Sequence, residues 1–185
     1  MRAWRVASAV IENDGQILLV ENKRADGRVD WSMPGGVIEE NEDPMLGLQR
    51  EVLEETGLVV ELWGPLLWTT FATSESMGFN LVAETYIAHA VGGEIAIDDP
   101  DGIVTACRYF SLDEAIEALE ATWVPTRQPL LGWLDERWPE PRTFDYSVEG
   151  NRGDGLIVEL RKDSGRNYLR NDGTSDQGAT ADKRK

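Results

Sequence analysis

The segment 36–58 limits what this 185-residue chain can fold into more than any other part of it. Its sequence, GVIEENEDPMLGLQREVLEETGL, predicts a helix from Asp43 to Glu55. Asp43 suits the N-cap, where a carboxylate accepts free backbone N–H groups, and Pro44 suits the first helical position, where no donor is needed. Gly57 follows as the residue that most easily adopts the left-handed conformation of a helix end. This helix is therefore the element whose two ends the sequence marks most clearly, and the other elements are placed relative to it.

Three glutamates of this helix, Glu51, Glu54 and Glu55, stand at spacings i, i+3 and i+4. Side chains at these spacings emerge from one helix face and can converge on one point. Three negative charges there repel one another unless a cation neutralises them, and hard carboxylate oxygens suit magnesium or manganese. The pattern therefore favours a divalent metal site. A solvated acidic surface is the alternative for such a pattern standing alone.

The whole segment resembles the Nudix box, G-x5-E-x7-R-E-U-x-E-E-x-G-U with U an aliphatic residue. Every fixed position is filled, by Gly36, Glu42, Arg50, Glu51, Val52, Glu54, Glu55, Gly57 and Leu58. The resemblance implies hydrolysis by water of a phosphoanhydride bond in a nucleoside diphosphate linked to a further group, with Mg²⁺ as cofactor and Mn²⁺ as an alternative. It implies Glu54 and Glu55 as the principal metal ligands and Glu51 as a ligand or a base. Glu51, Glu54 and Arg50 are thus the expected catalytic residues, with Arg50 orienting a carboxylate by bidentate pairing.

Residues just outside the helix are candidates for substrate binding. Gly35 and Gly36 let the backbone approach the metal or the phosphates without a Cβ clash. Arg24 and Arg28, on a charged loop with Lys23, can meet a phosphate chain or a ribose. Several aromatic side chains could stack a base, with ordinary core packing as the alternative: Trp31, Trp68, Phe71, Phe79 and Tyr86.

The remaining chain is mostly β-rich. Apolar or alternating runs predict strands over residues 6–11, 16–20, 31–33, 58–63, 66–72, 79–90, 94–97 and 106–110. Helices are expected over 112–120, which starts with a capping-box pattern, and over 129–137, and a terminal hairpin over 143–148 and 156–160. The resemblance implies an α/β (α+β) fold with a mixed β-sheet sandwiched between helices. We therefore expect a domain over 1–161 that includes the hairpin as an extension, and a disordered polar tail over 162–185.

The amino-acid composition limits the kinds of molecule that this protein can bind. Thirty-four acidic and eighteen basic residues give a net charge of -16, which disfavours nucleic acid polymers and anionic membranes. A bound divalent metal would reconcile this charge with an anionic, nucleotide-type small-molecule substrate. The single cysteine, Cys107, excludes an intramolecular disulfide and a thiolate zinc cage. No apolar run is long enough to span a membrane, so a cytoplasmic protein is expected. A homodimer is left open.

Three questions stay open at this point. A second base could come from Glu94, Asp98, Asp99 or Asp101, or these acids could form only a solvated turn. The substrate could be a nucleoside triphosphate, a nucleotide sugar, ADP-ribose or a dinucleoside polyphosphate. The alternative function is a catalytically weak binding module of the same fold that senses a nucleotide metabolite.

Overall fold

The first hairpin forms because two consecutive residues accept a left-handed backbone. Asp14 has φ 48° and Gly15 has φ 76°, which matches the tight turn expected from the Asp-Gly pair. Strands β1 (Arg2–Asn13) and β2 (Gln16–Lys23) therefore run antiparallel at this turn. The computed structural model describes residues 1–151 and 155–165.

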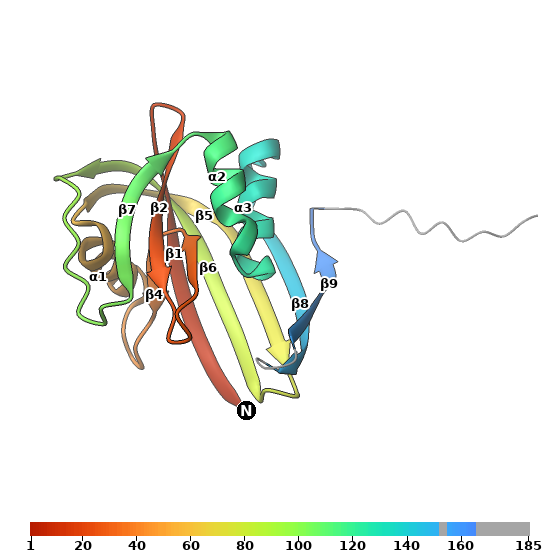
Figure 1. Ribbon diagram of the computed structural model, residues 1–185. Helices are drawn as coiled ribbons and strands as arrows, with labels where there is room; N and C mark the ends of the chain where they lie inside the picture. Colours follow the sequence, from red (N-terminus) through yellow and green to blue (C-terminus); the bar gives the residue numbers. More distant parts are fainter. Residues whose placement is uncertain (152–154, 166–185) are drawn as a thin grey trace, which may run out of the picture.

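The other elements follow in the order drawn in Figure 1. They are β3 (Val29–Ser32), β4 (Gly35–Val37), α1 (Pro44–Thr56), β5 (Val59–Ser74), β6 (Phe79–Gly92), β7 (Val104–Phe110), α2 (Leu112–Ala118), a 3-10 turn (Leu119–Ala121), α3 (Val124–Glu136), β8 (Arg142–Asn151) and β9 (Gly155–Asp163). Strand order within the described residues is β3-β2-β1-β6-β5-β8-β9, with β4 pairing β1 and β7 pairing β2. The pairs β1–β6 and β5–β8 are parallel and the others antiparallel, so the sheet is mixed as expected.

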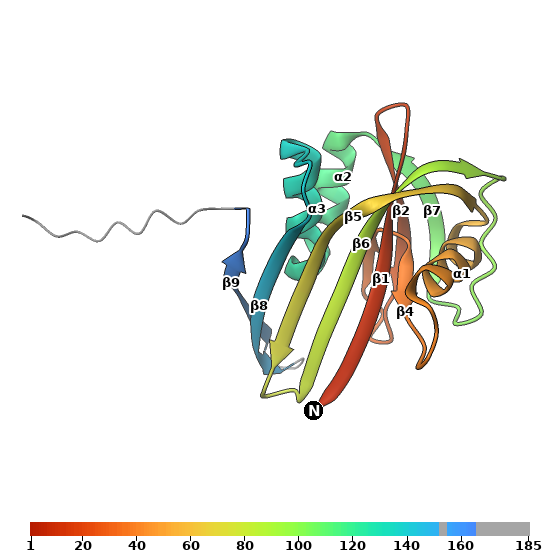
Figure 2. The ribbon, with the colours of Figure 1, turned by 180° about the vertical axis from the view of Figure 1, so that it is seen from behind.

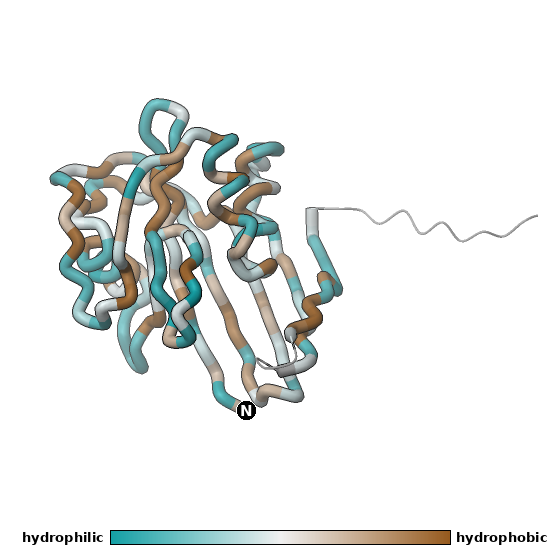
Figure 3. Tube along the Cα trace, viewed as in Figure 1, coloured by the Kyte–Doolittle hydropathy of each residue, from teal (hydrophilic) through white to brown (hydrophobic). Residues whose placement is uncertain are grey.

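Helices cover both faces of this sheet. Helix α1 lies on one face and α2 and α3 lie on the other, as Figures 1 and 2 show from opposite sides. The α1 face is packed with Ala9, Ile11, Leu48 and Val52, all fully buried. The opposite face contains a larger core built around Trp68, Phe110, Leu130 and other apolar residues. Hydrophobic stretches recur along the strands while the tip of the β1–β2 hairpin is hydrophilic (Figure 3).

Three expectations about strands and helices are wrong in detail. The runs 58–63 and 66–72 belong to one strand, β5, because Gly64 and Pro65 fall where the pairing register shifts and so do not break it. The run 94–97 is no strand, since the N–H groups of Ala96 and Asp98 bond to the C-terminal carbonyls of α1. Helix α3 begins before the expected residue 129, with a proline in its first turn.

The C-terminal hairpin continues past the expected boundary at residue 161. Strand β9 pairs with β8 as far as Asp163. Thr143 and Ser164 then exchange two bonds, Thr143 N–H to Ser164 Oγ at 2.8 Å and Ser164 N–H to the Thr143 carbonyl at 3.0 Å. The remainder of the expected tail, 166–185, lies outside the described residues. Across 1–151 and 155–165, no helix combines the length and apolar character needed to cross a membrane.

Candidate active site

Helix α1 has the ends that the sequence predicts. The Asp43 side chain accepts the N–H groups of Met45 and Leu46 at 3.0 and 3.2 Å. Gly57 closes the helix with φ 75°, and its N–H donates to the Leu53 carbonyl at 2.8 Å. Since the apolar stripe of the helix is buried in the core, its glutamates are directed to the remaining face.

Arg50 organises the acidic side chains of α1. Its bidentate partner is Glu42, with Nε and Nη2 each 3.2 Å from a carboxylate oxygen, whereas a metal-binding or catalytic carboxylate was expected in that place. Its Nη1 donates to Glu51 at 2.8 Å and to Glu54 at 3.2 Å. The guanidinium lowers the pKa of Glu42, and Glu42 and Glu51 raise the pKa of Arg50. One cation therefore holds three carboxylates together. We call Glu42, Arg50, Glu51, Glu54 and Glu55 the carboxylate cluster.

Gly36 provides the space that Glu51 occupies. A Cβ built on Gly36 would lie 2.5 Å from both Cδ and Oε2 of Glu51. The missing side chain at position 36 thus lets the carboxylate lie against the backbone of β4. Burial raises the pKa of Glu51, and the bond from Arg50 opposes that rise without cancelling it.

Glu55 is the most buried acid of the carboxylate cluster, with 8% of its surface exposed. The N–H of Gly35 donates to its Oε2 at 2.7 Å. Burial raises the pKa of Glu55 to about 8, and the neighbouring charges of Glu51, Asp99 and Glu54 add to the rise although the Gly35 bond opposes it. A buried carboxylate among other acids favours a bound proton or a bound cation. Gly35 itself has φ 140°, and a Cβ there would collide with the carbonyl of Ala7.

The acids left open as a second base lie on the segment that follows β6. The N–H of Asp98 donates to the Glu54 carbonyl at 2.8 Å, which fixes this segment beside the end of α1. Asp99 accepts the N–H groups of Ile103 and Val104 at 2.7 and 2.8 Å. Its charge acts on Glu55 and that of Asp101 acts on Glu51, in both cases raising the pKa. Two of the four open candidates are therefore electrostatic neighbours of the carboxylate cluster.

The carboxylate cluster has the donor chemistry for a divalent cation, although its acids are tied to protein partners. Within 1–151 and 155–165, no three His, Cys, Asp or Glu side chains stand together in a ready-made metal cage. Glu51 and Glu54 face the Arg50 guanidinium and Glu55 faces Gly35. Hard oxygen donors with a raised carboxyl pKa match Mg²⁺ or Mn²⁺.

A cavity of about 140 Å³ lies on the face of the sheet that α3 covers, and the start of α3 forms part of its wall. Gly35 lines this cavity and also donates to Glu55, so the two regions share a residue. The other lining residues come from β1, the β2–β3 region, β5, β6 and the start of α3. They are Val6, Ser8, Arg24, Ser32, Met33, Trp68, Thr70, Leu81, Ala83, Thr85, Trp123, Pro125 and Thr126.

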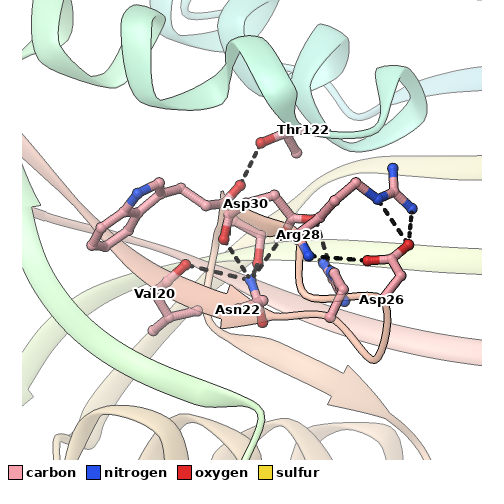
Figure 4. A network of polar contacts seen from close by, with 9 residues as sticks. Val20, Asn22, Asp26, Arg28, Asp30 and Thr122 are labelled. Atoms are coloured by element: carbon pink, nitrogen blue, oxygen red, sulfur yellow. Dashed lines mark hydrogen bonds and ion pairs between the residues drawn. The ribbon is translucent and has the colours of Figure 1, made fainter.

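The two loop arginines lie in different places. Arg24 lines the cavity and is paired with Asp30 through two bonds of 2.7 and 2.6 Å. Arg28 is not among the lining residues; it bonds to Asp26 at 2.8 Å, and 76% of its side chain is exposed. Figure 4 shows this pair at the loop between β2 and β3, away from the Asn22 contacts that tie the strands together.

Of the aromatic residues considered for either base stacking or core packing, Trp68 is the one that lines the cavity, and it is 1% exposed. Trp31 instead packs edge-on against Phe110, with ring centroids 4.8 Å apart. The sequence did not indicate that Thr70 and Trp123 line the cavity. No signal marked Trp123, because the helix that follows it was expected to begin only at residue 129.

Comparison with known proteins places this geometry in a family. The model of the NUDIX domain matches residues 1–134. A MutT-like protein of Streptomyces ambofaciens is 47% identical over 76% of this chain and 82% of its own length. An ADP-ribose pyrophosphatase of Methanocaldococcus jannaschii is 29% identical over 49% of this chain and 53% of its own length. The crystal structure of a MutT NUDIX hydrolase from Burkholderia pseudomallei is similar with a TM-score of 0.60, at 32% identity, covering 70% of this chain and 97% of that one.

Proposed function

The chain belongs to the Nudix hydrolase family, and from this premise we propose that it hydrolyses a phosphoanhydride bond in a nucleoside diphosphate linked to a further group, with Mg²⁺ as the natural cofactor. Mn²⁺ is the alternative metal. The leaving part is a phosphate ester, or pyrophosphate when the substrate is a nucleoside triphosphate. The net charge of -16 favours a small nucleotide over a nucleic acid polymer.

The observation that carries the proposal is the double role of Gly35. Its N–H bonds to Glu55, and the same residue lines the cavity. A ring bound in the cavity would therefore have its phosphate chain beside the carboxylate cluster. Arg24, also on the cavity wall, is placed to meet a ribose or the first phosphate. Arg28, largely exposed on the loop, is the candidate for contact with the outer group.

The carboxylate cluster supplies groups for both metal binding and base catalysis. We assign Glu54 and Glu55 as ligands of the metal and Glu51 as a ligand or the base. When bound, the metal would neutralise charge on phosphate oxygens and lower the pKa of a water molecule. Glu51 is suited to accept a proton because burial keeps its pKa above the ordinary carboxyl value. Arg50 holds Glu51 and Glu54 in place from one nitrogen and so acts as a positioning residue.

The test is release of a nucleoside monophosphate from a panel of nucleoside triphosphates, nucleotide sugars, ADP-ribose and dinucleoside polyphosphates, with and without Mg²⁺. We expect metal-dependent cleavage of some panel members and its loss in Glu54→Gln. Glu117→Gln is the matched control because Glu117 is an exposed acid on α2, outside the carboxylate cluster. If no panel member is cleaved, or if Glu54→Gln cleaves as fast as the unchanged protein, the proposal fails. Binding without cleavage would then support the metabolite-binding alternative.

A further inference from the structure

Strand β9 forms one edge of the sheet, and its outer side is open. Within 1–151 and 155–165, β9 is the last strand of the sheet order and pairs on one side only, with β8. Figure 1 shows it at the end of the sheet, with no described helix or strand beyond it. An edge strand carries backbone N–H and C=O groups that can pair with another chain, and proline often prevents this. Strand β9 is nine residues long and contains no proline.

The hairpin that contains β9 lies outside the part of the chain that the family model matches. The NUDIX model ends at residue 134, and β8 begins at Arg142. Strand β8 extends the sheet from β5, and Val148, Val158 and Leu160 belong to or pack against the larger core. The hairpin therefore covers that core and moves the open edge of the sheet from β5 to β9.

The charges of β9 differ from those of the chain as a whole. Two acids and two bases lie on this strand, so it is locally neutral, whereas the chain has a net charge of -16. They are Glu159, Asp163, Arg161 and Lys162. Two copies of so acidic a protein repel each other over most of their surface, and a neutral edge reduces that repulsion. In the part of the chain that the structure describes, the exposed side chains of Glu159, Arg161 and Lys162 form no ion pair.

The order of these charges along β9 makes the strand complementary to itself. In the pairing with β8, Glu159 lies opposite Ser147. Lys162 lies opposite Asp145, because a bulge in β9 takes up one residue. Alternate residues of β8 share a face, so Glu159 and Lys162 point to the same side of the sheet. In an antiparallel second copy with Leu160 opposite Leu160, Glu159 of each copy lies opposite Lys162 of the other. A parallel copy in the same register would place like charges side by side.

We propose that β9 is the interface of a homodimer, in which two copies of the strand pair antiparallel about a two-fold axis at Leu160. The same surface then serves both subunits, as in other two-fold dimers, and the two sheets become continuous. Backbone hydrogen bonds supply the affinity, and the two Glu159–Lys162 pairs fix direction and register. Ile157, which is 63% exposed in one copy, lies diagonally across from the aliphatic stem of Lys162 of the other. This contact does not depend on the proposed hydrolysis, since none of its residues lines the cavity or belongs to the carboxylate cluster.

The first experiment is sedimentation of the full chain over a range of concentrations. We expect a mass that approaches twice that of one 20.6 kDa chain as the concentration rises. Glu159→Lys turns two attractive contacts into repulsive ones, so it should raise the dissociation constant about tenfold or more. Adding Lys162→Glu to it exchanges the charges and should restore the dimer. Glu117→Lys makes the same charge change on α2 and should not weaken the dimer.

Three results of this experiment would overturn the inference. They are a monomer at every concentration, a dimer that Glu159→Lys does not weaken, and a double variant that is no tighter than Glu159→Lys alone. Far-UV circular dichroism of each variant shows whether the fold is kept, so that a loss of the dimer is not mistaken for unfolding.

Hydrogen exchange of the unchanged protein locates the contact without any substitution. In a single copy, alternate N–H groups of β9 bond to β8 and the others face outward. The dimer protects the outward set as well, so these N–H groups should lose their fast exchange as the concentration rises through the dissociation constant. The N–H groups of α2 are the internal control and should not change. Protection that persists on dilution would mean that another segment of the same chain covers the edge. Fast exchange at every concentration would mean that nothing covers it, and either result would refute the proposed interface.

Discussion

The carboxylate cluster and the cavity meet at Gly35, yet they are built in opposite ways. The acids of the cluster come from one helix and its flank, and their charges are matched by Arg50 and by backbone N–H groups. The cavity collects side chains from strands far apart in the sequence. The carboxylate cluster is thus encoded locally, whereas the cavity depends on the tertiary fold. We expect changes in the cluster to act chiefly on the catalytic rate and changes at the cavity to act chiefly on stability.

The largest effect is expected at the wall of the cavity. Trp68→Ala removes a ring that is 1% exposed and packed in the larger core, which should lower the free energy of unfolding by about 3 to 5 kcal/mol. Chemical denaturation measures this loss. Trp4→Ala, at a partly exposed residue of β1, is the control and should cost less. Equal losses of unfolding free energy at the two positions would mean that Trp68 contributes no more to the folded state than a partly exposed residue does.

A substitution next to the carboxylate cluster should lower the catalytic rate without lowering stability. Gly36→Ala places a Cβ where Glu51 lies, so the carboxylate must move, and we expect kcat to fall about 100-fold with little change in unfolding. Steady-state kinetics and a thermal melt give the two quantities. Gly132→Ala, whose Cβ would lie 3.4 Å from Trp138, should keep full activity. Unchanged kcat in Gly36→Ala would remove Glu51 from the catalytic assignment.

Glu55 should make the metal-free protein sensitive to pH. Its pKa rises from 4.5 in the unfolded chain to about 8 in the folded one, so the folded state binds the proton more tightly. Proton binding by Glu55 therefore stabilises the folded state fully below pH 4.5, and this stabilisation is lost as pH rises through about 8. Thermal melts recorded with a chelator should show this decline as a fall in Tm, at roughly 2 to 4 °C for each kcal/mol of lost stability. Glu55→Gln should reduce the slope and Glu117→Gln should not; identical slopes in all three proteins would contradict the prediction.

The smallest effect is expected where α3 is joined to β3. Thr122→Val removes the bond to the Trp31 carbonyl and should cost about 1 kcal/mol of stability. Thr105→Val, which loses an exposed bond of similar length, should cost less. A Thr122→Val protein with unchanged stability would show that this bond contributes nothing to holding α3 on β3.

The sequence predicted those parts of the site whose residues are neighbours along the chain. Asp43, Pro44 and Gly57 mark α1 by their own conformational preferences, and the spacing of the glutamates follows from the helical period. The role of the missing side chain at Gly36 was predicted only in part. Its missing Cβ was expected to admit a metal or phosphate, but in the structure it admits Glu51. Which group approaches a glycine depends on the packing of α1 against β4, and no local pattern contains that information.

The cavity could not be predicted in the same way. Thr70 and Trp123 lie on different elements, and they line one space only because β5 and the start of α3 are brought together by the sheet order. Likewise the run 94–97 has the composition of a strand, but the free carbonyls at the end of α1 take its N–H groups instead. For the cavity, tertiary contacts supply what local preference leaves undecided. For the run 94–97, a tertiary contact overrides the local preference for a strand.

The parallel pairing of β1 with β6 has a consequence for synthesis. Along one edge, residues 2–11 pair with residues 79–88. Along the other edge, β1 pairs with β4 only at residues 6–8 and with β2 only at residues 12 and 13. A nascent chain therefore carries a strand with one open edge until β6 has left the ribosome. Such non-local pairing slows folding and exposes the growing chain to aggregation, so the bacterial or cell-free yield of this protein should depend on chaperones more than its size suggests.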